Sequence, residues 1–230
     1  MNAQADGRSR PTRVLVVHNA LSPYRIPLFK QISTTPGFEF NFLFANRIEA
    51  DRDWSFDDIG IRYEIAEGPV IPVGNRRLRL WNFRGRPRWD EIDIVVNSDH
   101  LNGPELGVFL ICLLRRSPAL AWVPTTSITE CEEPAWKNRI KNGIIRRHTA
   151  AMVPGQDSVD FIESIAPGMK TFVCSNIVDN ANFARARQLE AAERRELLAK
   201  LGIEAPVLLY CGHLIERKGI DILTEAVRQL

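Results

Sequence analysis

The sequence has few cysteines and almost no excess of charge of either sign. Its four cysteines, among 230 residues, show neither a C-x-x-C pair nor the Cys/His spacing of a zinc site, so neither a disulfide framework nor a metal site is expected. The 30 basic and 28 acidic residues leave a net charge of +2, which does not favour a nucleic-acid partner. With 45% apolar residues, the chain has the balance of an ordinary globular protein.

A long hydrophobic run is also lacking. The longest apolar stretch, residues 106–114, is much shorter than the roughly 20 residues that a membrane-spanning helix needs. Residues 1–12 are polar, without the apolar core of a signal peptide, and are predicted to form a disordered tail. Together these absences predict a cytoplasmic protein.

Several strong catalytic motifs are missing. The chain contains no G-x-x-x-x-G-K-[ST], no G-x-G-x-x-G after a strand, no H-E-x-x-H and no G-x-S-x-G. Simple NTPase, dehydrogenase, metalloprotease and hydrolase functions therefore lose their sequence support.

Short β-branched runs alternate with helical segments over residues 13–180, and this alternation predicts an α/β fold with a doubly wound, parallel, Rossmann-like sheet. The predicted strands are residues 13–17, 38–44, 61–65, 91–96, 119–123, 149–153 and 170–174. The predicted helices between them are residues 27–33, 104–116, 134–148 and 157–165. Because ligands gather outside the carboxyl ends of such strands, the loops after Val17, Val96 and Val123 are predicted to share one rim.

The character of the sequence changes near residue 180. Residues 181–205 are predicted to be a link and a charged helix, and residues 206–230 a strand, a loop and an amphipathic helix. A β-α unit of about 25 residues buries too little apolar surface to fold alone, so we expect it to begin an incomplete second α/β domain. The alternative is that it completes the first sheet.

The loop before the last helix is basic. Arg217 and Lys218 stand directly before Gly219, where backbone N–H groups and the positive end of the helix dipole are exposed. This combination suits a diphosphate. A solvated pair of cations is the alternative.

At this loop the sequence resembles the donor domain of family 4 glycosyltransferases, which have the GT-B fold. The likeness consists of a strand that ends at Tyr210, followed by Gly212-His213-Leu214, and then by Lys218-Gly219 at the start of a helix. His213 stands where the family has an arginine. Similar segments occur upstream, in order, at residues 18–27, 153–162 and 176–183. The resemblance implies that Gly212, His213, Arg217 and Lys218 bind the donor diphosphate.

The resemblance also implies an activity. It is retaining transfer of a sugar from a nucleotide-sugar to a glycan or lipid-linked acceptor, without metal or cofactor, in polysaccharide biosynthesis. The Glu-rich signature of the family's second domain does not fall within the chain, so we expect no transfer by the chain alone. The alternative is a non-catalytic nucleotide- or sugar-binding module, or a half-enzyme that needs a partner; a sugar-nucleotide epimerase lacks identifiable acid and base residues.

Polar residues after the predicted strands are the candidates for acceptor binding: Asn19, Tyr24, Arg25, Asp99, Thr126 and Glu130. His100 follows Asp99 and is the weak catalytic candidate, because imidazole titrates near neutrality and a carboxylate can orient it. The alternative is that this pair is solvated or caps the following helix.

Two basic regions suggest that the protein docks on an anionic membrane surface, as a peripheral protein on the inner face of the membrane. The first interleaves arginines with aromatic residues over 76–89, and the second is the helix at 134–148. An equal alternative to docking is a loop whose aromatic residues pack on the domain. Binding of single-stranded nucleic acid is a more distant alternative, because the chain is nearly neutral overall.

Overall fold

The computed structural model describes most of the chain, and its residues divide into two compact units, 1–179 and 180–230. The described residues are 10–47, 59–66, 68–73, 76–79, 88–98, 103–130, 134–180, 184, 191–203, 208–212, 214 and 218–229. The domain roles expected from the sequence stay predictions.

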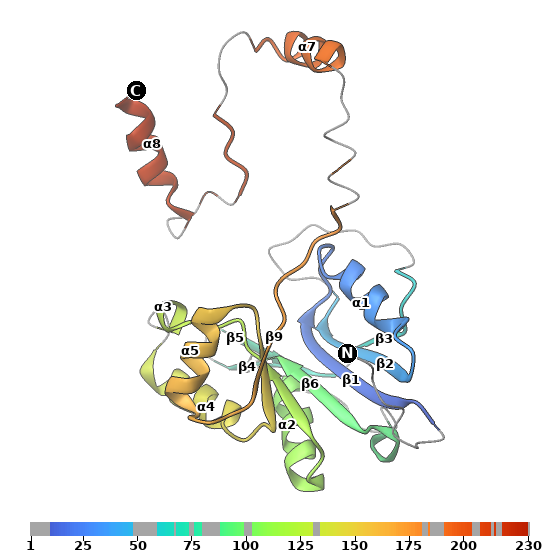
Figure 1. Cartoon of the computed structure of the whole chain (residues 1–230). Coiled ribbons are helices and arrows are strands. Elements are labelled where there is room, and N and C mark those ends of the chain that lie inside the picture. Colours follow the sequence, from blue (N-terminus) through green and yellow to red (C-terminus); the bar gives the residue numbers. More distant parts are fainter. Residues whose placement is uncertain are drawn as a thin grey trace. The chain divides into compact units, whose positions relative to one another are not determined.

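The first unit is built on a seven-stranded sheet in the order β3-β2-β1-β6-β7-β8-β9, and every neighbouring pair is parallel (Figure 1). The strands are β1 (Thr12–Ala20), β2 (Phe38–Asn46), β3 (Tyr63–Ile65), β6 (Ile94–Ser98), β7 (Ala119–Trp122), β8 (Ala150–Val153) and β9 (Thr171–Val173). The predicted parallel α/β sheet is confirmed.

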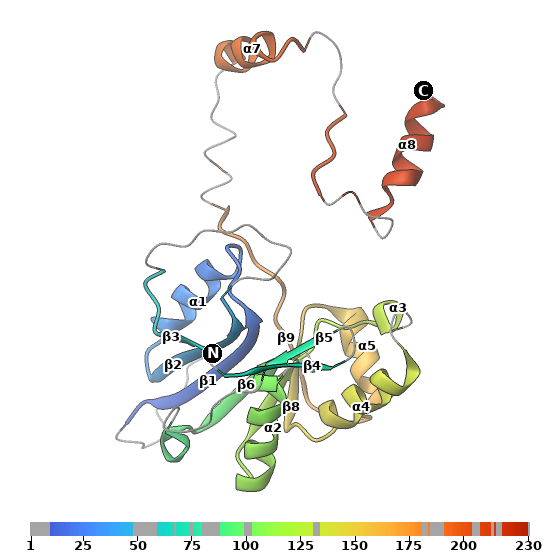
Figure 2. The same ribbon diagram turned by 180° about the vertical axis from the view of Figure 1, so that it is seen from behind.

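Helices cover both faces of this sheet (Figures 1 and 2). They are α1 (Ile26–Ser33), α2 (Gly103–Arg115), α3 (Ser127–Glu130), α4 (Ala135–Ile145) and α5 (Gln156–Ile165). In β1, Val14 and Val16 pack on the side of α1, whereas Leu15 and Val17 pack on the side of α2. The alternation of a strand thus gives each helix layer its own core, as in a doubly wound fold.

The core beneath α1 is aromatic. Phe40, Phe42 and Phe44 alternate along β2 and point to the same face, with 6.4 Å between successive ring centroids. Phe29 of α1 packs on two of them, 4.8 Å from Phe42 and 5.8 Å from Phe44, and is fully buried. The alternating pattern over 38–44, predicted as a strand near an edge, is therefore the strand next to edge strand β3.

Three local predictions are corrected. The tail expected to be disordered to residue 12 is ordered from Arg10, whose guanidinium makes two 2.9 Å bonds to the carboxylate of Asp93. β1 continues to Ala20, since its residues pair with β2 beyond Val17. Residues 76–79, in the basic region for which a loop was the alternative to membrane docking, form β5 (Arg76–Arg79) and pair antiparallel with β4 (Val70–Val73), because backbone pairing outweighs the charged composition.

The second unit holds α7 (Ala191–Lys200) and α8 (Ile220–Arg228). None of its described residues is buried, and Leu208 and Leu209 are exposed by 67% and 83%. The strand predicted at 206–210 is wrong over 208–210, where the structure has no regular secondary structure. An isolated strand without a partner leaves its backbone groups unsatisfied and does not form.

Candidate functional site

The order of the strands locates the candidate site. From β1 the chain builds the sheet in one direction through β2 and β3, and from β6 it builds in the other through β7, β8 and β9. The crevice outside the carboxyl ends of β1 and β6 is therefore the switch point at which doubly wound sheets bind their ligands. This is the rim that the sequence predicted.

A cluster of four aromatic and cationic side chains lies at this rim. The ring of His18, on β1, meets the ring of Trp122, on β7, edge to face at 5.5 Å between centroids. The guanidinium carbon of Arg25, just before α1, lies 4.7 Å from the Trp122 ring and 5.6 Å from the ring of Tyr24. Such cation–π contacts hold the guanidinium in place without neutralising its charge. The structure thus brings the predicted Tyr24 and Arg25 together with Trp122.

Two buried polar atoms lie in the same loop. Ser22 is 4% exposed, and its Oγ has no hydrogen-bond partner within the described residues; the same holds for Nε of Arg25. The backbone N–H of Arg25 donates to the carbonyl of Ser22 at 3.0 Å, so a tight turn places both residues at the positive end of α1. Buried polar groups are normally hydrogen-bonded, and an oxygen-rich or anionic ligand would supply the acceptors here.

Asn19 completes the β1 side of the rim. Its Oδ1 accepts a hydrogen bond of 3.3 Å from Nδ2 of Asn46, at the end of β2. The predicted Asn19 is thus oriented by a neighbouring strand.

A buried carboxylate secures the β6 side. Glu105 is 1% exposed in the first turn of α2, where the helix dipole favours a negative charge. Oγ of Ser98, the last residue of β6, donates to Oε1 of Glu105, and Nδ2 of Asn97 donates to its backbone carbonyl at 3.1 Å. These bonds tie the end of β6 to the start of α2. The predicted Asp99 and His100 lie between them, outside the described residues.

Thr126 and Glu130 are occupied by their surroundings. The backbone N–H groups of Thr126 and Thr129 each donate to the other's hydroxyl, at 2.8 and 3.3 Å, around the start of α3. The carboxylate of Glu130 accepts from Asn142 at 2.5 Å, and its carbonyl accepts from Asn138 at 2.7 Å. Thr126 therefore caps the start of α3 and Glu130 holds α3 against α4, roles that the sequence interpretation did not include.

The predicted donor residues belong to the second unit. Gly212 and Lys218 are exposed, and Gly219, before α8, has φ of +65°, a left-handed conformation that glycine adopts without strain. The predicted His213 and Arg217 lie outside the described residues.

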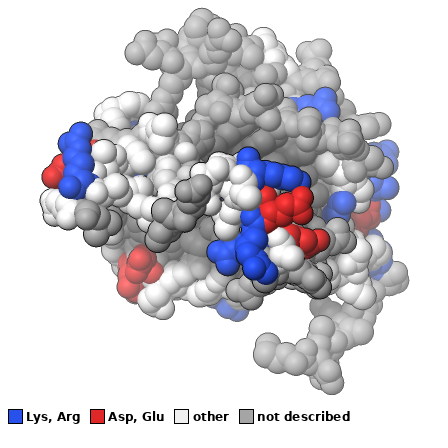
Figure 3. All heavy atoms as spheres, turned by 90° about the horizontal axis from the view of Figure 1, so that it is seen from above, with Lys and Arg blue, Asp and Glu red and all other residues white. Residues whose placement is uncertain are grey.

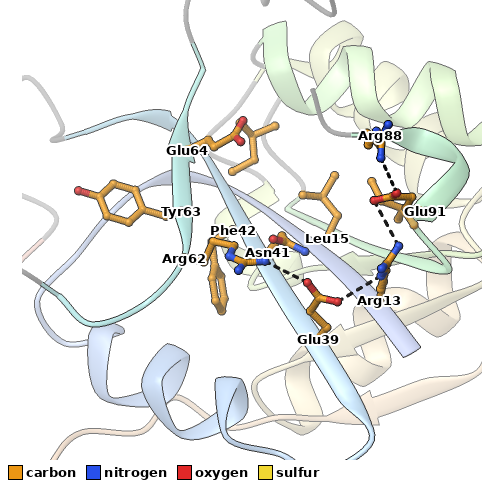
Figure 4. Close-up of a pocket in the computed structure, with 12 residues that line it drawn as sticks. Arg13, Leu15, Glu39, Asn41, Phe42, Arg62, Tyr63, Glu64, Arg88 and Glu91 are labelled. Atoms are coloured by element: carbon orange, nitrogen blue, oxygen red, sulfur yellow. Dashed lines mark hydrogen bonds and ion pairs between the residues drawn. The ribbon is translucent and has the colours of Figure 1, made fainter. Parts of the chain in front are cut away.

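A larger pocket, of about 370 Å³, opens at the other end of the strands (Figure 4). Five of its charged groups form a chain of ion pairs at 3.0 to 3.2 Å: Arg62, Glu39, Arg13, Glu91 and Arg88. Every one of these charges faces an opposite one, and the pocket lies at the amino ends of the strands. We therefore interpret these ion pairs as links between neighbouring strands, and the pocket as no ligand site.

The charges that Figure 3 colours occur in small mixed groups on the face seen from above. Lys and Arg side chains lie beside Asp and Glu side chains there. Residues 80–87 of the predicted basic region lie outside the described residues.

Sequence reasoning missed Ser22, Glu105 and Trp122 as parts of the rim. Trp122 lies inside the predicted strand 119–123, and Glu105 follows Pro104 at the start of a predicted helix, so neither stands out as polar at a strand end. The usable signal was position: Ser22 and Trp122 stand within five residues of the carboxyl end of a predicted strand, and Glu105 stands at the start of the helix that follows one.

His148 should make the stability of the first unit depend on pH. The imidazole stacks on Phe109 with 5.1 Å between ring centroids, and burial lowers the pKa of His148 from its ordinary 6.5. As the pH falls, His148 is therefore protonated in the unfolded chain before it is protonated in the folded one. The free energy of unfolding is highest above pH 6.5 and decreases as the pH drops below that value.

We expect the Tm to fall between about pH 7 and pH 5, and we expect His148→Leu to reduce this fall, as followed by circular dichroism. Glu105 and Lys141 line the same small pocket and are unchanged in the variant. An identical pH dependence in both proteins would contradict the assignment.

Among the described residues, no helix combines the length and apolarity needed to cross a bilayer, and no group of three or more His, Cys, Asp or Glu could hold a metal ion. No family model matches the chain, and no curated protein is similar to it in sequence.

Proposed function

We propose that residues 13–180 bind the acceptor of a retaining GT-B-type glycosyltransferase, and that residues 206–230 belong to its nucleotide-sugar domain. The observation that carries the proposal is the cluster of His18, Arg25 and Trp122 at the switch point of the sheet, with Ser22 buried beside it. A guanidinium held over an aromatic ring, near a helix N-terminus, is suited to a phosphate oxygen. A lipid-linked acceptor carries such a phosphate next to its sugar.

The start of α8 supports the donor half of the proposal. Lys218 precedes a left-handed glycine at the first turn of a helix, which is the local arrangement expected around a diphosphate. Within the described residues, however, the second unit has no buried side chain. A pocket for a nucleotide-sugar needs a packed wall, so we infer that this unit requires further protein surface to bind a donor.

The second candidate is a half-enzyme or a non-catalytic sugar- or nucleotide-binding module. The unburied second unit favours it over a self-sufficient transferase. The two differ in whether the rim binds an acceptor that a partner can then glycosylate.

The test is a pair of measurements on the purified chain. Calorimetry with a soluble short-chain prenyl diphosphate that carries one sugar should show binding to the first unit. Incubation of the chain with nucleotide-sugars and this probe should show no transfer, because the donor site is not packed. Transfer by the chain alone, or binding of a dinucleotide at the rim with no binding of the probe, would overturn the proposal.

A further inference from the structure

Helix α2 exposes an apolar stripe in the first unit. Leu106, Leu110 and Leu113 recur at the spacing of one helix face and are exposed by 36%, 48% and 48%. Leu114 stands beside them with 83% of its surface exposed. The opposite face of the same helix is buried through Val108, Phe109 and Cys112, so the exposed leucines are not needed for the core.

Helix α4 lies next to α2 (Figures 1 and 2) and exposes apolar side chains of its own. Leu106 of α2 and Lys141 of α4 line one small pocket. On α4, Trp136 and Ile140 follow one another at helical spacing with exposures of 67% and 51%. We call the exposed side chains of these two helices the α2–α4 face: Leu106, Leu110, Leu113, Leu114, Trp136 and Ile140.

The two helices of the α2–α4 face carry mostly positive charge, although the carboxylate of Glu130 accepts a hydrogen bond from Asn142 of α4. Residues 103–117 and 134–148 contain seven of the chain's 30 Lys and Arg, but only one of its 28 acidic residues. That one is Glu105, which is 1% exposed and bonded to Ser98. Arg115, Arg116 and Arg139, by contrast, are exposed. A chain with a net charge of only +2 thus concentrates positive charge where it also exposes leucine and tryptophan.

We propose that the α2–α4 face docks the protein on a lipid bilayer that contains anionic lipids. Leucine and tryptophan enter the boundary between headgroups and acyl chains, while lysine and arginine at the rim meet the headgroup phosphates. A second copy of the chain fits the face less well, because its cations would meet cations. Single-stranded nucleic acid also fits less well, since four of the six apolar residues are leucines, which offer no ring for a base to stack on.

The end of α2 offers a variant that separates docking from folding. The backbone N–H of Ser117 donates to the carbonyl of Cys112 at 3.0 Å, and Arg116 between them has φ of 56°. Glycine is the usual residue in this helix-ending motif, and arginine is strained there. Arg116→Gly therefore removes a cation from the rim while leaving the fold as stable or more so.

The test uses co-sedimentation of the full chain with vesicles of phosphatidylcholine alone or mixed with phosphatidylglycerol. We expect binding to the mixed vesicles at low salt, loss at high salt, and little binding to phosphatidylcholine. Arg116→Gly should weaken binding about fivefold, and Leu114→Glu at least about tenfold. Ile177→Glu, at another exposed apolar residue of the first unit, is the matched control and should bind as the unaltered chain does.

Other outcomes overturn the proposal. These are equal binding to both kinds of vesicle, binding unaffected by Leu114→Glu, or no binding together with a dimer that Leu114→Glu dissociates in sedimentation velocity. The inference does not depend on the glycosyltransferase proposal. The vesicles carry no acceptor and the acceptor probe is soluble, so either proposal can fail while the other stands.

Discussion

Replacement of Phe29 by alanine is expected to lower the free energy of unfolding of the first unit by about 3–5 kcal/mol. Phe29 is fully buried and contacts both Phe42 and Phe44 from α1, so its loss opens a cavity between α1 and β2. The rigid sheet cannot collapse into that space. Urea denaturation followed by circular dichroism measures the change.

Phe38→Ala is the matched control. Phe38 stands at the start of β2, is 44% exposed and lies 6.0 Å from the ring of Phe40. It loses little buried area on truncation, so we expect a change of about 1 kcal/mol or less. Equal losses in the two variants would show that α1 does not cover the sheet as described.

Arg25→Ala is expected to weaken binding of the prenyl diphosphate probe by about 10- to 100-fold. A charge-assisted hydrogen bond contributes about 1.5–3 kcal/mol, and the described residues place no acidic side chain against Arg25. Its guanidinium is therefore available to an anionic ligand. Calorimetry on the two proteins measures the loss, and a thermal melt shows that the fold is kept.

Two further variants sharpen this experiment. Lys30→Ala removes an exposed cation from the same helix and should leave binding within about twofold, since long-range charge effects are screened. Arg25→Lys keeps the charge but loses the planar fork, and should restore only part of the affinity. Equal binding by Arg25→Ala and the unaltered chain would remove the rim as the phosphate site.

The proposed carbohydrate chemistry rests on sequence likeness, whereas the rim rests on geometry. Asn19, Tyr24 and Arg25 were placed correctly at the carboxyl end of β1 because a buried strand and two prolines limited where the helix could start. Thr126 and Glu130 were chosen by the same logic, yet their polar groups are taken up by Thr129, Asn138 and Asn142. Position along the chain predicts which residues reach a rim, but not which of them are already hydrogen-bonded there.

The sequence by itself determined the layered α/β architecture, since runs such as 13–17 and 149–153 are hydrophobic enough to be buried on both faces and the helices between them are amphipathic. Only the tertiary structure decided that His18 and Trp122, more than a hundred residues apart, share one rim with Arg25. It also decided that Glu105 is buried while the leucines of the same helix are exposed. The physical reason is that hydrophobic periodicity is a local property, whereas strand order and the pairing of helices depend on contacts between distant segments.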